Sequence, residues 1–125
     1  MNNEDIPHHN SISDPKVFGP GLWYSIHTSS INLSENCFMD YIRMTVLNIP
    51  CMTCRQHATQ YLKDNPIEDF KGIKNSDGEL IGMFKWTWTF HNAVNKRLDK
   101  PQVDWNTAYN MYTNTDAICS LSCGR

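Results

Sequence analysis

The chain has 125 residues, a formal net charge of −2 and an isoelectric point near 6.2, so it suits one domain with a single hydrophobic core. This charge argues against the strongly basic class of nucleic-acid-binding domains. No apolar run approaches the roughly 20 residues that span a bilayer, and the polar residues 1–14 lack the features of a secretory signal or a transit peptide. We therefore expect no nucleic acid and no membrane among the partners, and a protein that stays where it is made.

The hydrophobic pattern predicts an all-α fold, a small helical bundle, because no segment alternates convincingly in the way of a strand. In chain order we expect a mobile tail over 1–15, helices over about 22–33, 37–47, 51–63 and 80–98, and a short helix from 104 to 112. The fourth helix carries a stripe of residues near one face: Met83, Phe84, Trp88, His91, Val94, Asn95 and Leu98.

Helix-breaking and capping residues set these boundaries. The run Gly19-Pro20-Gly21 marks the entry to the first helix, and Asn65-Pro66 ends the third. Residues 66–79 are polar and rich in turn-forming residues, which predicts a loop. Pro101 closes the fourth helix, and Asp104 suits the N-cap of the fifth.

Cys51 and Cys54 stand three positions apart at the predicted start of the third helix. This spacing places both sulfurs on one side of a helix, close enough to bridge, and the helix N-terminus stabilises a thiolate. The same spacing is also half of a zinc site, for which His57 or His91 could supply nitrogen ligands. The pair alone leaves redox chemistry and zinc binding about equally open.

Trp23 and His27 lie four residues apart, so they share a face of the first helix. An indole beside an imidazole can form the wall of a site for a planar ligand. Taken alone, a buried core tryptophan with a hydrogen-bonded histidine beside it is the better interpretation.

His91 and Asn95 lie one turn apart in the fourth helix, with Val94 and Leu98 on the same side. A dinucleotide cofactor needs an apolar slot with a few polar groups, and cations for its pyrophosphate. The cations follow at the helix end: Lys96, Arg97 and Lys100. The helix dipole explains the cations by themselves. It does not explain the polar pair on a core-facing stripe, because buried polar groups are costly without partners.

Three cysteines remain. Cys119 and Cys123 form a second pair in the C-terminal tail, where a tethered dithiol could relay electrons between a client protein and the first pair by thiol–disulfide exchange. Cys37 stands alone on the second helix, where it is expected to be a small buried residue.

Together these motifs resemble the Erv/ALR family of FAD-linked sulfhydryl oxidases, over residues 16–113. They occur in the family's order: Gly-x-x-x-Trp-x-x-x-His at Gly19 to His27, Cys-x-x-Cys at Cys51 and Cys54, and His-Asn-x-Val-Asn-x-x-Leu-x-Lys-Pro at His91 to Pro101. The chain is most similar in kind to the compact members found in large cytoplasmic DNA viruses.

The resemblance implies a four-helix bundle with a short fifth helix, FAD bound at the bundle end, and a homodimer. It divides the chain into a tail over 1–15, an oxidase domain over 16–113 and a C-terminal tail over 114–125. The residues expected to bind FAD are Gly19, Trp23, His27, Cys54, Trp88, His91, Asn92, Val94, Asn95, Lys96, Leu98, Lys100 and Tyr112.

The implied activity is the oxidation of thiols to disulfides in reduced protein substrates. Cys51 would exchange with the client and Cys54 would lie against the flavin, so that electrons pass through FAD to O₂ and yield H₂O₂. Cys119 and Cys123 would act as the shuttle, and no metal would be needed. Such an enzyme would work in the host cytoplasm, at the viral factory, or in the virion. The alternative is a zinc-binding interaction module that uses Cys51, Cys54 and His57.

Overall fold

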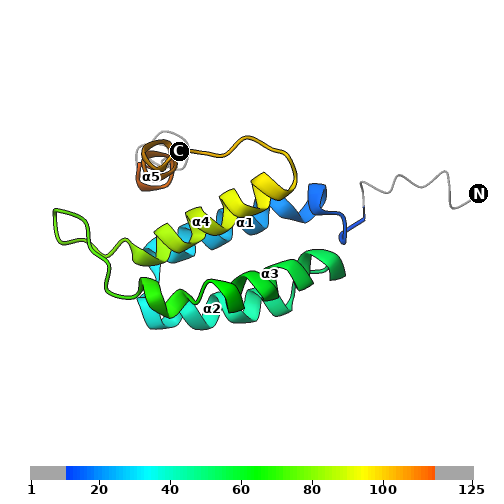
Figure 1. The fold of residues 1–125 in the computed structure, drawn as a ribbon, viewed down its shortest axis with the longest axis horizontal. Coiled ribbons are helices and arrows are strands. Elements are labelled where there is room, and N and C mark those ends of the chain that lie inside the picture. The colour runs from blue at the N-terminus through cyan, green and yellow to red at the C-terminus, as the bar shows by residue number, and fades with distance from the viewer. Residues whose placement is uncertain (1–10, 115–125) are drawn as a thin grey trace, which may run out of the picture.

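Two pairs of helices pack into a four-helix bundle in the computed structural model, which describes residues 11–114 (Figure 1). The first pair is α1 (Pro15–Asn32) with α4 (Gly82–Arg97), and the second is α2 (Glu35–Leu47) with α3 (Met52–Asp64). A short fifth helix, α5 (Trp105–Thr113), lies outside the bundle on the side of α1 and α4. Over these residues the chain has no strand, which confirms the all-α prediction.

Side chains cap four of the helices at their N-termini. Asp14 accepts a hydrogen bond from the backbone N–H of Lys16, and Ser34 accepts one from that of Cys37. The sulfur of Cys51 caps α3 by accepting from the Cys54 N–H, and Asp104 caps α5 as expected. Such caps satisfy N–H groups that have no partner within the helix.

The predicted start of the first helix was wrong. α1 begins at Pro15, and Pro20 lies inside it. Asp14 at the N-cap followed by proline at the first helical position is a strong start signal, since that position needs no N–H donor. Gly19 and Gly21 keep negative backbone φ angles, so they do not break the helix.

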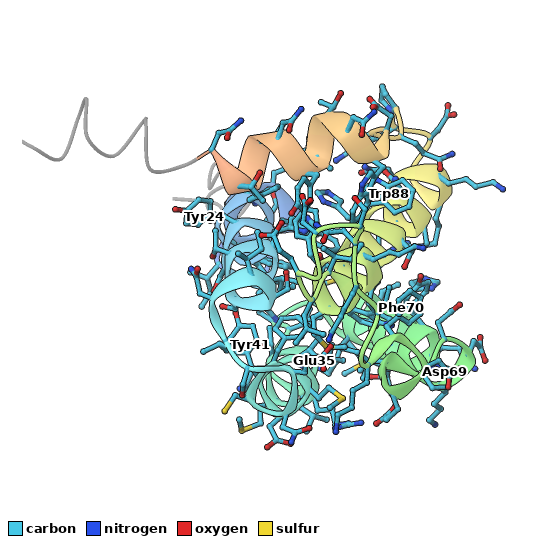
Figure 2. All side chains as sticks on the ribbon, turned by 90° about the vertical axis from the view of Figure 1, so that its left-hand side faces the viewer. Tyr24, Glu35, Tyr41, Asp69, Phe70 and Trp88 are labelled. Atoms are coloured by element: carbon cyan, nitrogen blue, oxygen red, sulfur yellow. The ribbon has the colours of Figure 1, made fainter. Side chains whose placement is uncertain are left out.

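The segment predicted as a loop over 66–79 contains a short 3₁₀ helix, η3 (Ile67–Phe70), and a tight turn closed by a single bridge between Lys74 and Leu80. The Glu35 carboxylate accepts a hydrogen bond from the Gly72 N–H, at 3.0 Å, and so ties this segment to the start of α2. Figure 2 shows Glu35 facing the segment that carries Phe70.

The face of α4 that enters the core differs from the predicted stripe. Met83 and Phe84 are buried as expected, but Trp86, Thr87 and Phe90 complete the buried face instead of Trp88. Trp86 is completely buried, and its indole N–H donates to the Asn65 carbonyl oxygen at 2.9 Å.

Trp88 turns toward α5 (Figure 2). Its indole N–H donates to the carbonyl oxygen of Val103 at 2.7 Å, and its ring meets Trp105 edge to face. α4 thus carries tryptophans on two sides because one side, with Trp86, packs in the bundle core and the other, with Trp88, packs against α5.

None of the helices that the structure describes combines the length and hydropathy of a bilayer-spanning segment.

Candidate active site

A large open cavity of about 1130 Å³ lies between α1, α3 and the C-terminal half of α4. Small-molecule sites commonly measure roughly 300–1,000 Å³, so this one suits a large ligand. Most of the predicted cofactor-binding residues line it: Gly19, Trp23, Cys54, His91, Val94, Asn95, Leu98, Lys100 and Tyr112. Residues 20–26 and 90–100, far apart in sequence, thus meet at one site.

Three predicted cofactor-binding residues lie outside the cavity wall. Trp88 packs toward α5, and Lys96 is exposed beyond the lining. Asn92 uses its side-chain amide to hold Val103, since its Nδ2 donates to the Val103 carbonyl oxygen and its Oδ1 accepts from the Val103 N–H, both at 2.9 Å. That these three residues touch FAD stays a prediction.

His27, the fourth such residue, lies behind His91. Its Nε2 is 2.9 Å from Nδ1 of His91, and its Nδ1 is 2.9 Å from Oγ1 of Thr87. His27 is buried, and the ring of Tyr112 lies close to it, with ring centroids 4.7 Å apart. His27 is therefore placed to hold the cavity wall from behind.

Burial keeps both histidines neutral. It lowers the pKa of His27 to about 3, helped by the neighbouring His91. It also lowers the pKa of His91 to about 4, helped by the positive charge of Lys100. His91 on the cavity wall and His27 behind it are therefore both neutral imidazoles at physiological pH.

The two cysteines occupy different environments in the dithiol form. Cys51 Sγ accepts a hydrogen bond from the Cys54 N–H at 3.2 Å, and hydrogen bonds from Cys54 lower the pKa of the Cys51 thiol. Burial, together with the hydrogen bond to Cys51, raises the pKa of the Cys54 thiol to about 11. Only Cys54 lines the cavity, so the pair divides into one solvent-side thiolate former and one cavity-side thiol.

Cationic side chains line the cavity, as do the carboxylates of Asp14 and Asp64. Lys16, Arg97 and Lys100 line it, and Arg97 lowers the pKa of both cysteine thiols as a secondary cause. Lys100 is brought back to the site by the end of α4, where its N–H donates to the Asn95 carbonyl oxygen at 2.7 Å. Asp99 takes the left-handed conformation, with φ of 57°, that this C-cap requires.

The sequence reasoning missed several lining residues, above all Tyr61, Phe90 and Phe18. Tyr61 stacks on Phe90 with ring centroids 4.9 Å apart, and its hydroxyl donates to Thr89. A signal for Tyr61 did exist, because it follows Cys54 by two helical turns and so shares its face. Phe90 gave no such signal, since it falls outside the polar motif that follows it.

The zinc alternative finds no support. His57 lines the cavity, but within residues 11–114 no three His, Cys, Asp or Glu side chains come together in a way that could hold a metal ion. Cys37 is exposed, which corrects the expectation of a buried residue, and its N–H is the group that Ser34 caps. The predicted shuttle pair Cys119 and Cys123 lies outside the described residues.

Comparisons with known proteins identify the family of the chain. Residues 20–113 match the model of the Erv1 / Alr family. A FAD-linked sulfhydryl oxidase of African swine fever virus (isolate Tick/Malawi/Lil 20-1/1983) is 32% identical over 102 residues, which cover 76% of this chain and 79% of the relative. The enzyme of the isolate Pig/Kenya/KEN-50/1950 has the same identity and coverage. Protein 088R of frog virus 3 is 31% identical, over 78% of this chain and 67% of its own length. The chain therefore belongs to the Erv1/Alr family.

Proposed function

We propose that this chain is a viral FAD-dependent thiol oxidase that forms disulfide bonds in reduced protein substrates, with Cys51 and Cys54 as its redox pair. One observation carries the assignment of roles. Cys54 lies on the wall of a cavity large enough for a dinucleotide, and Cys51, three residues away, lies outside it. A dithiol placed in this way can receive electrons on one side and deliver them on the other.

The residues of the cavity fit FAD. Trp23, Tyr61 and Phe90 contribute aromatic surface beside a planar ring system, and the walls are mainly apolar. Lys16, Arg97 and Lys100 supply cations for a pyrophosphate. His91 and Asn95 add uncharged polar side chains to the lining. When bound, FAD supplies the two-electron acceptor, which O₂ would reoxidise with formation of H₂O₂.

The thiol chemistry follows from the two environments. A client thiolate attacks Cys51 Sγ of the Cys51–Cys54 disulfide, which forms a mixed disulfide and releases Cys54. The second client thiol then attacks the client sulfur of that mixed disulfide and releases Cys51. The lowered pKa of Cys51 favours this second step, because a thiol of low pKa leaves faster. The client has lost two electrons and two protons, and the reduced pair holds them beside the cavity.

We propose further partners on narrower grounds. Cys119 and Cys123 would relay electrons from clients to Cys51 by thiol–disulfide exchange.

The chain would form a homodimer. The exposed residues Val17, Tyr24 and Ile31 offer one candidate dimer face, since a spacing of seven residues aligns them on one side of α1. The enzyme would act in the host cytoplasm, at the viral factory, or in the virion. Sedimentation of the Tyr24→Asp variant tests the dimer face, which a dimer as stable as that of the unmodified chain would exclude.

The proposed function is tested with the purified full chain. We expect one FAD per chain by visible absorbance, and O₂ consumption matched by H₂O₂ and by loss of thiols from a reduced protein. The Cys37→Ser variant should keep full activity, and it serves as the control that removes a cysteine outside the proposed redox pair. A colourless protein that binds zinc in stoichiometric amounts would contradict the proposal.

A further inference from the structure

The hydroxyl of Thr87 has no role in the function proposed above. Thr87 is completely buried on α4, next to His27. Its Oγ1 lies 2.7 Å from the carbonyl oxygen of Phe84 and 2.9 Å from Nδ1 of His27. A carbonyl oxygen only accepts, so the hydroxyl proton of Thr87 lies between the two oxygens. If it pointed to His27 instead, two acceptor oxygens would face each other at that short distance without a proton.

This placement fixes the proton on His27. Since Thr87 has given its proton to Phe84, Oγ1 can only accept from His27, and His27 therefore carries its proton on Nδ1. A neutral imidazole has one N–H, and the burial of His27 favours the neutral form. Nε2 of His27 is then an acceptor.

The position of the proton on His91 follows in the same way. Nδ1 of His91 lies 2.9 Å from Nε2 of His27, so it must be the donor of that hydrogen bond. The chain of donors thus runs in one direction, from His91 to His27 to Thr87 to the Phe84 carbonyl oxygen. The remaining nitrogen of His91, Nε2, carries a lone pair and no proton.

Nε2 of His91 is open to the cavity. It has no hydrogen-bond partner among the described residues, and no buried side-chain nitrogen or oxygen in that part of the chain lacks a partner. His91 lines the cavity, where its ring lies flat against Trp23. The lone pair is therefore the polar group that His91 offers to a ligand.

We propose that Thr87 is a positioning residue that sets the direction of this hydrogen-bond chain, so that His91 accepts a hydrogen bond from an O–H or N–H group of bound FAD. The identity of the ligand rests on the proposed function, whereas the proton order rests on the three hydrogen bonds and on the burial of His27. The opposite order would make His91 a donor and would select a ligand acceptor in its place.

The proton order is tested by nitrogen NMR on the full chain labelled with ¹⁵N-histidine, with the cofactor that it carries after purification. Two-bond correlations distinguish an imidazole protonated at Nδ1 from one protonated at Nε2. We expect Nδ1–H on both His27 and His91. A proton on Nε2 of His91 would overturn the inference, whether or not FAD is present. A colourless chain with the expected tautomers would refute the proposed function and leave the proton order standing.

Two variants test the role of Thr87. Thr87→Val has almost the same shape but no hydroxyl, so His27 loses its acceptor, and we expect a mixture of tautomers at His91 and roughly tenfold weaker FAD binding by equilibrium dialysis. Thr87→Ser keeps the hydroxyl and should keep the tautomers and an affinity within about twofold of the unmodified chain. Equal loss in both variants, or unchanged tautomers and affinity in Thr87→Val, would overturn the inference. If Thr87→Val does not fold, the serine variant and the spectrum of the unmodified chain still decide.

Discussion

The imidazole of His91 lies flat on the indole of Trp23, with ring centroids 3.9 Å apart and planes within 2° of parallel. One ring comes from α1 and the other from α4, so the contact joins the two motifs that the sequence separates by more than sixty residues. Trp23 also meets Phe90 edge to face, with centroids 5.1 Å apart. The cavity wall is thus built from aromatic contacts between the paired helices.

Replacement of Trp23 should weaken both the fold and the site. Trp23→Ala removes the contacts with His91 and Phe90, and we expect a loss of roughly 2 to 4 kcal/mol in the free energy of unfolding. FAD should be released at lower temperature, as measured by the fluorescence of free flavin. Trp23→Phe keeps an aromatic face and should recover most of both properties. Flavin release from Trp23→Ala at the temperature of the unmodified chain would exclude this role.

Stability should depend on the neutral histidines. The pKa values of His27 and His91 are lowered to about 3 and about 4 from an ordinary value of 6.5, so the unfolded chain binds more protons than the folded chain below pH 6.5. The free energy of unfolding is therefore greatest above that pH and falls as the pH drops toward 4. With a discount for the partly exposed His91, we expect a loss of roughly 2 kcal/mol between pH 6.5 and pH 5.

Urea unfolding followed by tryptophan fluorescence measures this dependence. The pH slope of His27→Asn should be clearly smaller than that of the unmodified chain, whatever its absolute stability. The lowered pKa of Asp104 places its titration below this range of pH, so it does not contribute to the slope. A flat stability between pH 6.5 and pH 5 would contradict the assignment of two buried neutral imidazoles.

The thiols of Cys51 and Cys54 should differ in reactivity after reduction under anaerobic conditions. The pKa of Cys51 is lowered and that of Cys54 is raised to about 11, so Cys51 carries the larger fraction of thiolate at any pH below these values. We expect iodoacetamide to modify Cys51 at least about tenfold faster than Cys54, as read by mass spectrometry of peptides. Exposed Cys37 is an internal reference in the same digest. Faster modification of Cys54 would reverse the proposed division.

The end of α4 can be stabilised without touching the site chemistry. Asp99 takes a left-handed conformation and places a negative charge at a helix C-terminus, and both features are unfavourable. Asp99→Gly should raise the free energy of unfolding by about 0.5 to 1 kcal/mol. Asp99→Asn removes only the charge, so the difference between the two variants isolates the backbone effect. A glycine variant less stable than the asparagine variant would show that the conformation costs nothing here.

The sequence predicted the helices well where caps and periodicity agree, and less well where they conflict. Pro101 correctly predicted the end of the fourth helix, and Asp104 correctly predicted the start of the fifth. Gly19-Pro20-Gly21 suggested a break, but the helix starts earlier, at the Asp14 cap, and continues through Pro20, although a proline there removes one hydrogen bond and crowds the preceding turn. Helix propensities and capping rules contain no information about how strongly the packing of α1 on α4 offsets that cost.

The same limit applies to the site. Trp23, Cys54 and His91 could be predicted from motif spacing, because each belongs to a short motif whose residues share one face of a single helix. The buried hydroxyl of Thr87 and the outward turn of Trp88 could not, because they depend on which face of α4 meets α1 and which meets α5. Tertiary packing decides that choice, and the periodicity of α4 alone allows both.

We claim above all that electrons reach FAD through Cys54, and anaerobic reduction of the purified chain by dithiothreitol tests this claim most directly. The unmodified chain should lose its flavin absorbance in the visible range as the dithiol is added, with one dithiol consumed for each FAD beyond those that reduce the Cys51–Cys54 disulfide and a disulfide between Cys119 and Cys123. Cys54→Ser should stay yellow under the same conditions, and Cys37→Ser should bleach like the unmodified chain. Bleaching of Cys54→Ser at the rate of the unmodified chain would contradict the claim.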